Sequence, residues 1–247
     1  DNFDEILDVS EGIMIARGDL GIETPMEEIP FWQKTIIKKC LRQGKPVITA
    51  TQMLESMVKE PLPTRAEISD VGNAVLDKTD ALMLSGETAM GKYPVEAVSW
   101  MVRSALFLED NDTLNNSYNV KNYPIVDQTA AVTMAAYQLS RDLPELKGFL
   151  VLTEGGHTAS MLARLRPQMP IYAFTHDENV RDRMYLTWGV KPYLFNYKTL
   201  SDKEIKRIVE FLDQKEEKIE KGDKIIMVCG KSWGTPGKTS MIRLLEI

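Results

Sequence analysis

The sequence has few of the features that mark secreted, membrane-spanning or nucleic-acid-binding proteins. Its only two cysteines, Cys40 and Cys229, fall in a predicted helix and a predicted strand, which favours buried thiols in a reducing compartment such as the cytoplasm over a disulfide. The apolar runs are too short for a membrane span, and no secretory leader pattern follows Asp1. A net charge of -6 without a dense Lys/Arg stripe argues against a nucleic-acid partner.

Histidine is also scarce, and the chain opens without methionine. The two histidines, His157 and His176, lack a neighbouring Cys/His pattern, so the sequence predicts no zinc site. The first residues, from Asp1, follow an acidic helical pattern, and we expect the chain to be a piece of a longer protein. The remaining composition, 43% hydrophobic and 27% charged, is ordinary for a globular protein.

Three apolar segments in the first half share one design. Residues 12–16, 45–50 and 80–84 are each of strand length, end in polar residues and precede a stretch of helical periodicity. Strand-helix units in series predict a parallel sheet, and α/β folds keep their chemistry at its carboxyl edge. The polar residues expected at that edge are Arg17, Asp19, Thr51, Gln52, Ser85 and Glu87.

These strand ends have the composition of a cation and phosphate site. Taken alone, Asp19 could be a helix-capping or loop carboxylate. Oxygen-bearing residues at three neighbouring strand ends suit Mg²⁺ bound to a phosphorylated substrate. Gly18 would let a backbone N–H approach an anionic oxygen without a Cβ in the way. On these residues alone, the metal site and the capping role both stay open.

Helix signals and composition divide the chain. Residues 30–43 carry an apolar stripe that ends before Gly44, Thr64 and Glu67 form a capping box, and Pro94 begins a third helix. An Asn- and Asp-rich stretch with little apolar periodicity follows, which indicates a linker. We predict a first domain at residues 1–112, a linker at 113–124 and a second domain at 125–247.

The second domain has its own alternation of helices and strands. This alternation predicts a three-layer α/β domain with a mostly parallel sheet and an antiparallel final hairpin. The predicted helices cover residues 127–141, 156–165, 178–186 and 201–220. The predicted strands cover residues 149–152, 171–174, 191–195, 224–229 and 241–246.

A Gly-rich turn in this domain is a candidate phosphate site. A strand leads through it into a helix start, where free N–H groups and the helix dipole favour an anion. A plain turn capped by Thr158 is the alternative, and the carboxylate of Glu154 would repel a phosphate unless a protonated His157 partly offset it. The candidate binding residues are Thr153, Gly155, Gly156 and Thr158.

A second Gly-rich segment covers residues 232–239. It invites a nucleotide-binding P-loop interpretation, which we reject because Ser232 stands where that pattern needs glycine and because a strand, not a helix, should follow. A hairpin loop facing Thr153 is the remaining interpretation. The candidate binding residues here are Gly234, Thr235, Gly237 and Lys238.

Taken in order, the motifs of this chain resemble those of the pyruvate kinase family. They cover essentially the whole chain and include the strand ends described above. The matching stretches are Gly12 to Gly21 (GIMIARGDLG), Lys45 to Met57 (KPVITATQMLESM), Pro63 to Glu67 (PTRAE), Ser69 to Val71 (SDV), Asn73 to Asp77 (NAVLD), Met83 to Ala89 (MLSGETA) and Tyr93 to Ala97 (YPVEA).

The resemblance implies a fold and a reaction. The first half would supply strands six to eight of a (β/α)₈ TIM barrel, and the second half would be the C-terminal regulatory domain. The family transfers a phosphoryl group from phosphoenolpyruvate to ADP, giving pyruvate and ATP, with Mg²⁺ and usually K⁺. By this resemblance Asp19 is the Mg²⁺ ligand, and Gly18 and Asp19 offer backbone N–H groups to the substrate. Thr51 lies near the enolate carbon and Ser85 joins the proton relay, whereas the role of Arg17 stays open.

The same resemblance implies what the chain does not contain. The family's catalytic Lys, a second Mg²⁺ carboxylate, a phosphate-binding Arg and the K⁺ ligands come from earlier strands. Phosphoryl transfer depends on positioned cations, so we expect activity in the complete enzyme and not in this chain alone. A non-catalytic effector-binding or assembly module of the same fold is the alternative.

Regulation and assembly are implied as well. Family members bind sugar phosphates between the Thr153 loop and the loop at residues 233–238, and they are usually homotetramers. Because Glu154 is acidic, we predict a weak or absent response to a bisphosphorylated sugar. A monophosphate effector that contacts Lys238 stays open.

Overall fold

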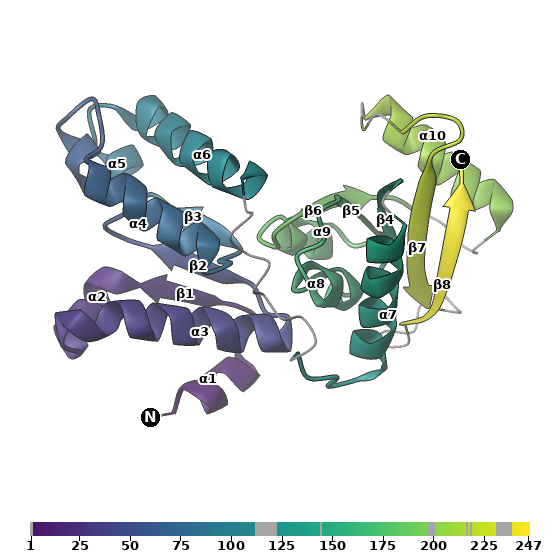
Figure 1. The fold of residues 1–247 in the computed structure, drawn as a ribbon, viewed down its shortest axis with the longest axis horizontal. Coiled ribbons are helices and arrows are strands. Elements are labelled where there is room, and N and C mark those ends of the chain that lie inside the picture. The colour runs from purple at the N-terminus through teal and green to yellow at the C-terminus, as the bar shows by residue number, and fades with distance from the viewer. Residues whose placement is uncertain are drawn as a thin grey trace. The chain divides into compact units, whose positions relative to one another are not determined.

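The computed structural model describes residues 2–111, 123–143, 145–196, 201–215, 217, 219–230 and 239–247. The chain divides into two compact units, unit 1 at Asp1–Asn122 and unit 2 at Tyr123–Ile247 (Figure 1). Most of the linker predicted at 113–124 lies outside the described residues.

Unit 1 is built on a three-stranded parallel sheet with the order β1-β2-β3. Its strands are β1 (Ile13–Ala16), β2 (Val47–Ala50) and β3 (Ala81–Met83). Its helices are α1 (Phe3–Val9), α2 (Arg17–Glu23), η1 (Met26–Glu28), α3 (Ile29–Gln43), η2 (Glu55–Val58), α4 (Arg65–Leu76), α5 (Gly86–Ala89) and α6 (Pro94–Asp110). In Figure 1, α3 runs along β1, and α4 lies near β3. The described strands form an open sheet, as expected of a partial barrel.

Helix ends in unit 1 follow the sequence signals. The Glu67 N–H donates to Thr64 Oγ1 at 3.2 Å and the Thr64 N–H donates to Glu67 Oε2 at 2.7 Å, so the predicted capping box opens α4. Helix α3 ends at Gly44, whose φ of 67° is left-handed. Pro94 is the first residue of α6, where its missing N–H costs nothing.

Unit 2 is a five-stranded sheet with the order β6-β5-β4-β7-β8. All its strand pairs are parallel except β7 with β8, which confirms the predicted mostly parallel sheet and final hairpin. Its strands are β4 (Leu146–Leu152), β5 (Ile171–Thr175), β6 (Val190–Leu194), β7 (Lys224–Gly230) and β8 (Thr239–Glu246). Its helices are α7 (Gln128–Asp142), α8 (His157–Ala163), α9 (Glu178–Met184) and α10 (Asp202–Gln214).

Helices cover both faces of the sheet in unit 2. Ile205, Ile208 and Leu212 lie on one stripe of α10 and pack in a cluster with alternate residues of the central strands, such as Leu150 and Leu152. Helices α7 and α8 contact each other; α7 also contacts β7 and β8, and α8 contacts β4 and β5. The predicted three-layer arrangement is therefore confirmed.

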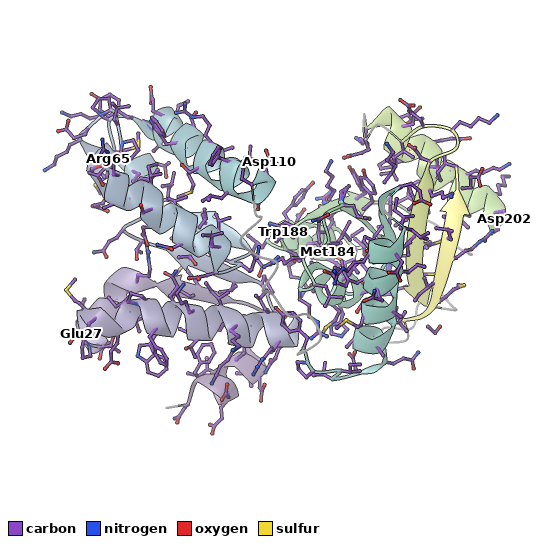
Figure 2. All side chains as sticks on the ribbon, viewed as in Figure 1. Glu27, Arg65, Asp110, Met184, Trp188 and Asp202 are labelled. Atoms are coloured by element: carbon purple, nitrogen blue, oxygen red, sulfur yellow. The ribbon has the colours of Figure 1, made fainter. Side chains whose placement is uncertain are left out.

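Three predicted helices of unit 2 were too long, of which α9 ends at Met184 rather than at residue 186. Helix α10 begins at Asp202, labelled in Figure 2, and ends at Gln214 rather than at residue 220. Ile219 lies outside any helix and is buried in the same cluster as Leu212, so packing against the sheet accounts for an apolar residue at this position. Helix α8 begins after Gly156 because that residue has a φ of 85°, outside the helical region.

Candidate active site

The three strands of unit 1 end at the same level. Ala16 pairs with Ala50, and Ala50 pairs with Met83, so the last residues of β1, β2 and β3 are neighbours across the sheet. The strands are parallel, and the residues that follow them therefore emerge at one edge. The structure thus brings the predicted site residues to a common carboxyl edge, although it uses them in different ways.

The turn after β2 has an unusual backbone. Thr51 has a φ of 65° and Gln52 a φ of 53°, both in the left-handed region. For a β-branched residue such as Thr51 this conformation is a genuine outlier. Strained backbone of this kind persists only where the surroundings hold it, and it clusters at functional sites.

The side chain of Arg17 is buried against this turn and is not exposed at the carboxyl edge of the sheet, where the sequence placed it. Arg17 begins α2, and its side chain is 8% exposed. Its Nη2 donates to the carbonyl oxygens of Thr51 at 2.7 Å and Gln52 at 3.1 Å. Its Nη1 forms an ion pair with Asp70 of α4, with a separation of 2.6 Å. The guanidinium therefore links the turn after β2 to helix α4.

Gly18, Asp19 and Thr51 lie beside one another at the edge. The Gly18 N–H donates to Thr51 Oγ1 at 2.9 Å, and the Thr51 hydroxyl donates to the Ala50 carbonyl at 2.7 Å. Asp19 is exposed in the first turn of α2, and within the described residues its carboxylate has no hydrogen bond or ion pair. Ala16 is the N-cap of α2 and makes no side-chain capping bond, so the alternative of Asp19 as a cap is wrong.

A Cβ at position 18 would find room within the described residues. Its nearest neighbour would be Thr51 Oγ1 at 3.6 Å, an ordinary van der Waals distance. The chain's own packing therefore does not require glycine at position 18.

The turn after β3 contains one unsatisfied hydroxyl and one buried carboxylate. Ser85 Oγ is buried and has no hydrogen-bond partner among the described residues. Glu87, which the sequence placed at the site edge, is fully buried instead. Its carboxylate accepts the N–H groups of Leu54 at 3.0 Å and Ser85 at 2.8 Å, and so joins the turns after β2 and β3.

Three supporting side chains had no assigned role in the sequence reasoning: Arg17, Asp70 and Glu87. Each acts on backbone or charge far along the chain, such as the 53 residues between Arg17 and Asp70. The sequence offered no local signal for these contacts, because each depends on which distant segments meet.

In unit 2, the structure describes four of the eight candidate effector residues. The Gly156 N–H donates to Thr153 Oγ1 at 3.0 Å, and Thr158 Oγ1 lies 2.7 Å from Thr239 Oγ1, so both hydroxyls are engaged. Helix α8 has Gly156 as its N-cap, and the alternative of Thr158 as the cap is wrong. Gly155 has open space where a Cβ would lie. The other four, Gly234, Thr235, Gly237 and Lys238, lie outside the described residues.

The charged groups near this turn pair differently from the expectation. His157 Nε2 lies 2.7 Å from Asp127 Oδ2, whereas Glu154 Oε2 lies 3.6 Å from His176 Nδ1. Burial opposes ionisation of Asp127, but hydrogen bonds from the Ala130 N–H and from His157 lower the pKa of its carboxyl. His157 is thus paired with Asp127 and does not offset Glu154.

Comparisons with known proteins account for both units. The family described as pyruvate kinase, barrel domain, matches residues 1–98, and the family described as pyruvate kinase, alpha/beta domain, matches residues 130–245. The chain belongs to the pyruvate kinase family. The predicted resemblance is confirmed, and β1, β2 and β3 are strands of a partial barrel.

Individual relatives match nearly the whole chain. The pyruvate kinase of Sporosarcina psychrophila is 44% identical over 99% of this chain and 42% of its own length, and that of Dictyostelium discoideum is 45% identical over 100% and 50%. A crystal structure of a pyruvate kinase from Cryptosporidium parvum is 39% identical, with a TM-score of 0.87 over 99% of this chain and 48% of that one. The chain spans about half the length of these relatives or less.

Pyruvate kinases as a family generally depend on Mg²⁺ and K⁺. Among the described residues, no three His, Cys, Asp or Glu side chains group so that they could hold a metal ion. Asp19 nevertheless fits as a single Mg²⁺ ligand, because its carboxylate is exposed and unpaired within the described residues, and Mg²⁺ is usually held by one or two carboxylates plus substrate oxygens. Within the described ranges, no helix has the length and apolar character needed to cross a membrane.

Proposed function

We propose that this chain is part of a pyruvate kinase that transfers the phosphoryl group of phosphoenolpyruvate to ADP, giving pyruvate and ATP. One observation carries the proposal: at the carboxyl edge of the sheet the Gly18 N–H donates to Thr51 Oγ1 at 2.9 Å, and the next residue, Asp19, has an exposed carboxylate without a partner among the described residues. Backbone N–H groups, a hydroxyl and a free carboxylate are the groups that bind an anionic substrate together with a divalent cation.

The residues of unit 1 would share the work of binding. Gly18 and Asp19 stand in the first turn of α2, where N–H groups lack an intrahelical acceptor and can face the substrate anion. The Gly18 N–H would keep its bond to Thr51 Oγ1 and face the substrate oxygen as a shared donor. Asp19 would hold Mg²⁺, which neutralises charge that develops on the transferred group.

Two hydroxyl groups would act on the enolate that phosphoenolpyruvate becomes when it loses its phosphoryl group. Thr51 Oγ1 is held at a fixed position by the Gly18 N–H and the Ala50 carbonyl, beside the proposed enolate carbon. Ser85 Oγ is buried without a partner among the described residues, so it is available to a water relay that delivers a proton. The catalytic Lys, the second Mg²⁺ carboxylate and the K⁺ ligands would come from other parts of the enzyme.

Unit 2 would serve regulation and assembly in a cytoplasmic homotetramer. The two cysteines, Cys40 and Cys229, are free and buried, which supports a reducing compartment. An effector would bind at the Thr153 to Thr158 turn together with the loop that contains Lys238. Glu154 supports a weak or absent response to a bisphosphorylated sugar.

The test is a lactate-dehydrogenase-coupled assay of pyruvate formation, with phosphoenolpyruvate, ADP, Mg²⁺ and K⁺. It compares the full-length product of the gene with the 247-residue chain. Activity in the full-length product alone supports the proposal, and Asp19→Asn should lower it by about 100-fold or more. Glu23→Gln, an exposed carboxylate at the other end of α2, is the matched control and should change it less than about threefold. Inactivity of both chains would favour the non-catalytic module.

A further inference from the structure

We propose that Arg17 is a positioning residue: its guanidinium, anchored by Asp70, holds the turn at Thr51 and Gln52 in its left-handed conformation and so fixes the Thr51 hydroxyl against Gly18. The proposal rests on the proposed function, because it gives Arg17 a part in the reaction through Thr51. Arg17 itself is not placed in contact with the substrate.

The turn needs a partner of this kind. Thr51 and Gln52 have φ values of 65° and 53°, and two consecutive residues other than glycine rarely adopt this region. Their carbonyl oxygens both point to Arg17 Nη2, at 2.7 and 3.1 Å, and Arg17 Nε donates again to the Thr51 oxygen at 3.2 Å. A turn whose two carbonyls share one cation cannot relax to negative φ without breaking those bonds.

Arginine is the side chain that suits the task. Its planar group donates in several fixed directions, here to backbone oxygens through Nε and Nη2 and to Asp70 through Nη1. Lysine is a point charge on a flexible stem and cannot make both sets of contacts in one geometry. Arg17→Lys would therefore keep the positive charge but could not donate to the carbonyl oxygens of the turn and to Asp70 at the same time.

The anchor is itself held by the fold. Asp70 lies in the second turn of α4, and that helix begins at the capping box of Thr64 and Glu67. Glu67 also accepts the N–H and hydroxyl of Ser56, in η2 beyond the strained turn. Arg65, labelled in Figure 2, is the first residue of α4 and marks the end of the helix at which the capping box lies. The position of Thr51 is thus determined through Arg17 and Asp70 by α4.

If Arg17 only stabilised the fold, its replacement would cost the same activity with or without the Thr51 hydroxyl. A double-mutant cycle of Arg17 and Thr51 separates that structural role from the positioning role. In the full-length enzyme, Arg17→Lys should lower kcat/KM for phosphoenolpyruvate by about tenfold or more. In a Thr51→Val background the same change should cost less than about threefold, because the hydroxyl that Arg17 positions is gone. Arg103→Lys, on an exposed arginine of α6, is the control and should change the rate less than about twofold.

Equal losses in the two backgrounds would overturn the proposal. Asp70→Asn is the second variant if Arg17→Lys folds poorly, and it should show the same dependence on Thr51 with a smaller loss. Crystal structures of these variants give a readout independent of activity, in which φ of Thr51 and Gln52 should become negative. Retention of both positive angles would reject the positioning role even if the enzyme proved to catalyse another reaction. Absence of pyruvate formation by the unmodified full-length enzyme would reject the proposed function instead.

Discussion

The two units bury their strands to different extents. All five residues of β5 and six of the seven residues of β4 are buried, whereas no residue of β3 is fully buried and Met14 of β1 is 51% exposed. Both sheets are mainly parallel, and parallel strands are normally covered on both faces. Unit 2 meets that requirement within its own residues, and unit 1 does not.

The difference in burial indicates what stabilises each unit. Most of the exposed large apolar side chains among the described residues lie in unit 1, and most of the buried apolar side chains lie in unit 2. The proposed chemistry lies in the less covered unit, whose strained turn at Thr51 and Gln52 is held by buried polar groups such as Arg17. Burial of its own apolar side chains stabilises unit 2. Unit 1 leaves apolar side chains exposed that the rest of a complete barrel would cover.

Separation of the units should give the largest effect. Produced alone, residues 123–247 should unfold in one cooperative transition, because their helices cover both faces of the sheet. Residues 1–122 alone should bind a hydrophobic dye and aggregate, because their sheet has two open edges. Circular dichroism in urea and light scattering give the readouts. A monomeric 1–122 fragment with a sharp transition would contradict the comparison.

A matched pair of phenylalanine substitutions tests the burial argument. Phe174 of β5 is fully buried among other aromatic rings, so Phe174→Ala should lower the free energy of unfolding by about 3–5 kcal/mol. Phe31 of α3 is 62% exposed, and Phe31→Ala should change it by about 0.5 kcal/mol or less. Urea denaturation of the whole chain measures both. Similar losses at the two positions would show that the exposed face of α3 is covered in solution.

Buried hydroxyls without partners allow a finer comparison. Ser85 Oγ in unit 1 and Thr129 Oγ1 in unit 2 are both buried and have no hydrogen-bond partner among the described residues. Ser85→Ala and Thr129→Val should each raise the free energy of unfolding by about 1 kcal/mol, because an unsatisfied group is removed. In the full-length enzyme, only Ser85→Ala should lower kcat, by about tenfold or more. Loss of activity in both variants would contradict the proposed relay.

Acidification should give the smallest effect. Burial opposes ionisation of Glu67 and Asp127, but hydrogen bonds from Ser56 and Thr64 to the first, and from Ala130 and His157 to the second, lower the pKa of each carboxyl. Stability from such groups is full above the unfolded-state pKa and is lost as pH falls through the lower folded-state value. Asp127→Asn should therefore lose less stability than the parent as the pH falls below about 4, the ordinary pKa of an aspartate. Identical losses in urea denaturation would show that the Asp127 contacts do not persist in solution.

The sequence was sufficient for features that depend on neighbouring residues. The capping box at Thr64 and Glu67, the left-handed Gly44 and the alternating elements of unit 2 are local patterns, and the structure confirms them. The alternation of strands with helices was enough to predict that most of the sheet in unit 2 is parallel, and the structure confirms the predicted antiparallel final pair. The order of the strands was not predicted, because it depends on which strands pair across the sheet.

The supporting contacts could not be predicted, because they depend on which strand ends meet. Arg17 reaches oxygens 34 and 35 residues away, and Glu87 reaches the Leu54 N–H 33 residues away. The strain at Thr51 has no signal in the sequence either, since threonine normally avoids that conformation. The resemblance to a family supplied the site residues, and the structure adds how the chain holds them.

The most direct test of the account replaces one hydroxyl in each unit. In the full-length enzyme, Thr51→Val should lower kcat for pyruvate formation by about 100-fold, because the proposed chemistry lies at the carboxyl edge of unit 1. Thr133→Val removes a buried hydroxyl of α7 whose hydrogen bonds, among the residues that the structure describes, are to carbonyls of its own helix, and it should change kcat by less than about threefold. Full activity of the Thr51→Val enzyme would contradict the assignment of the active site to these strand ends.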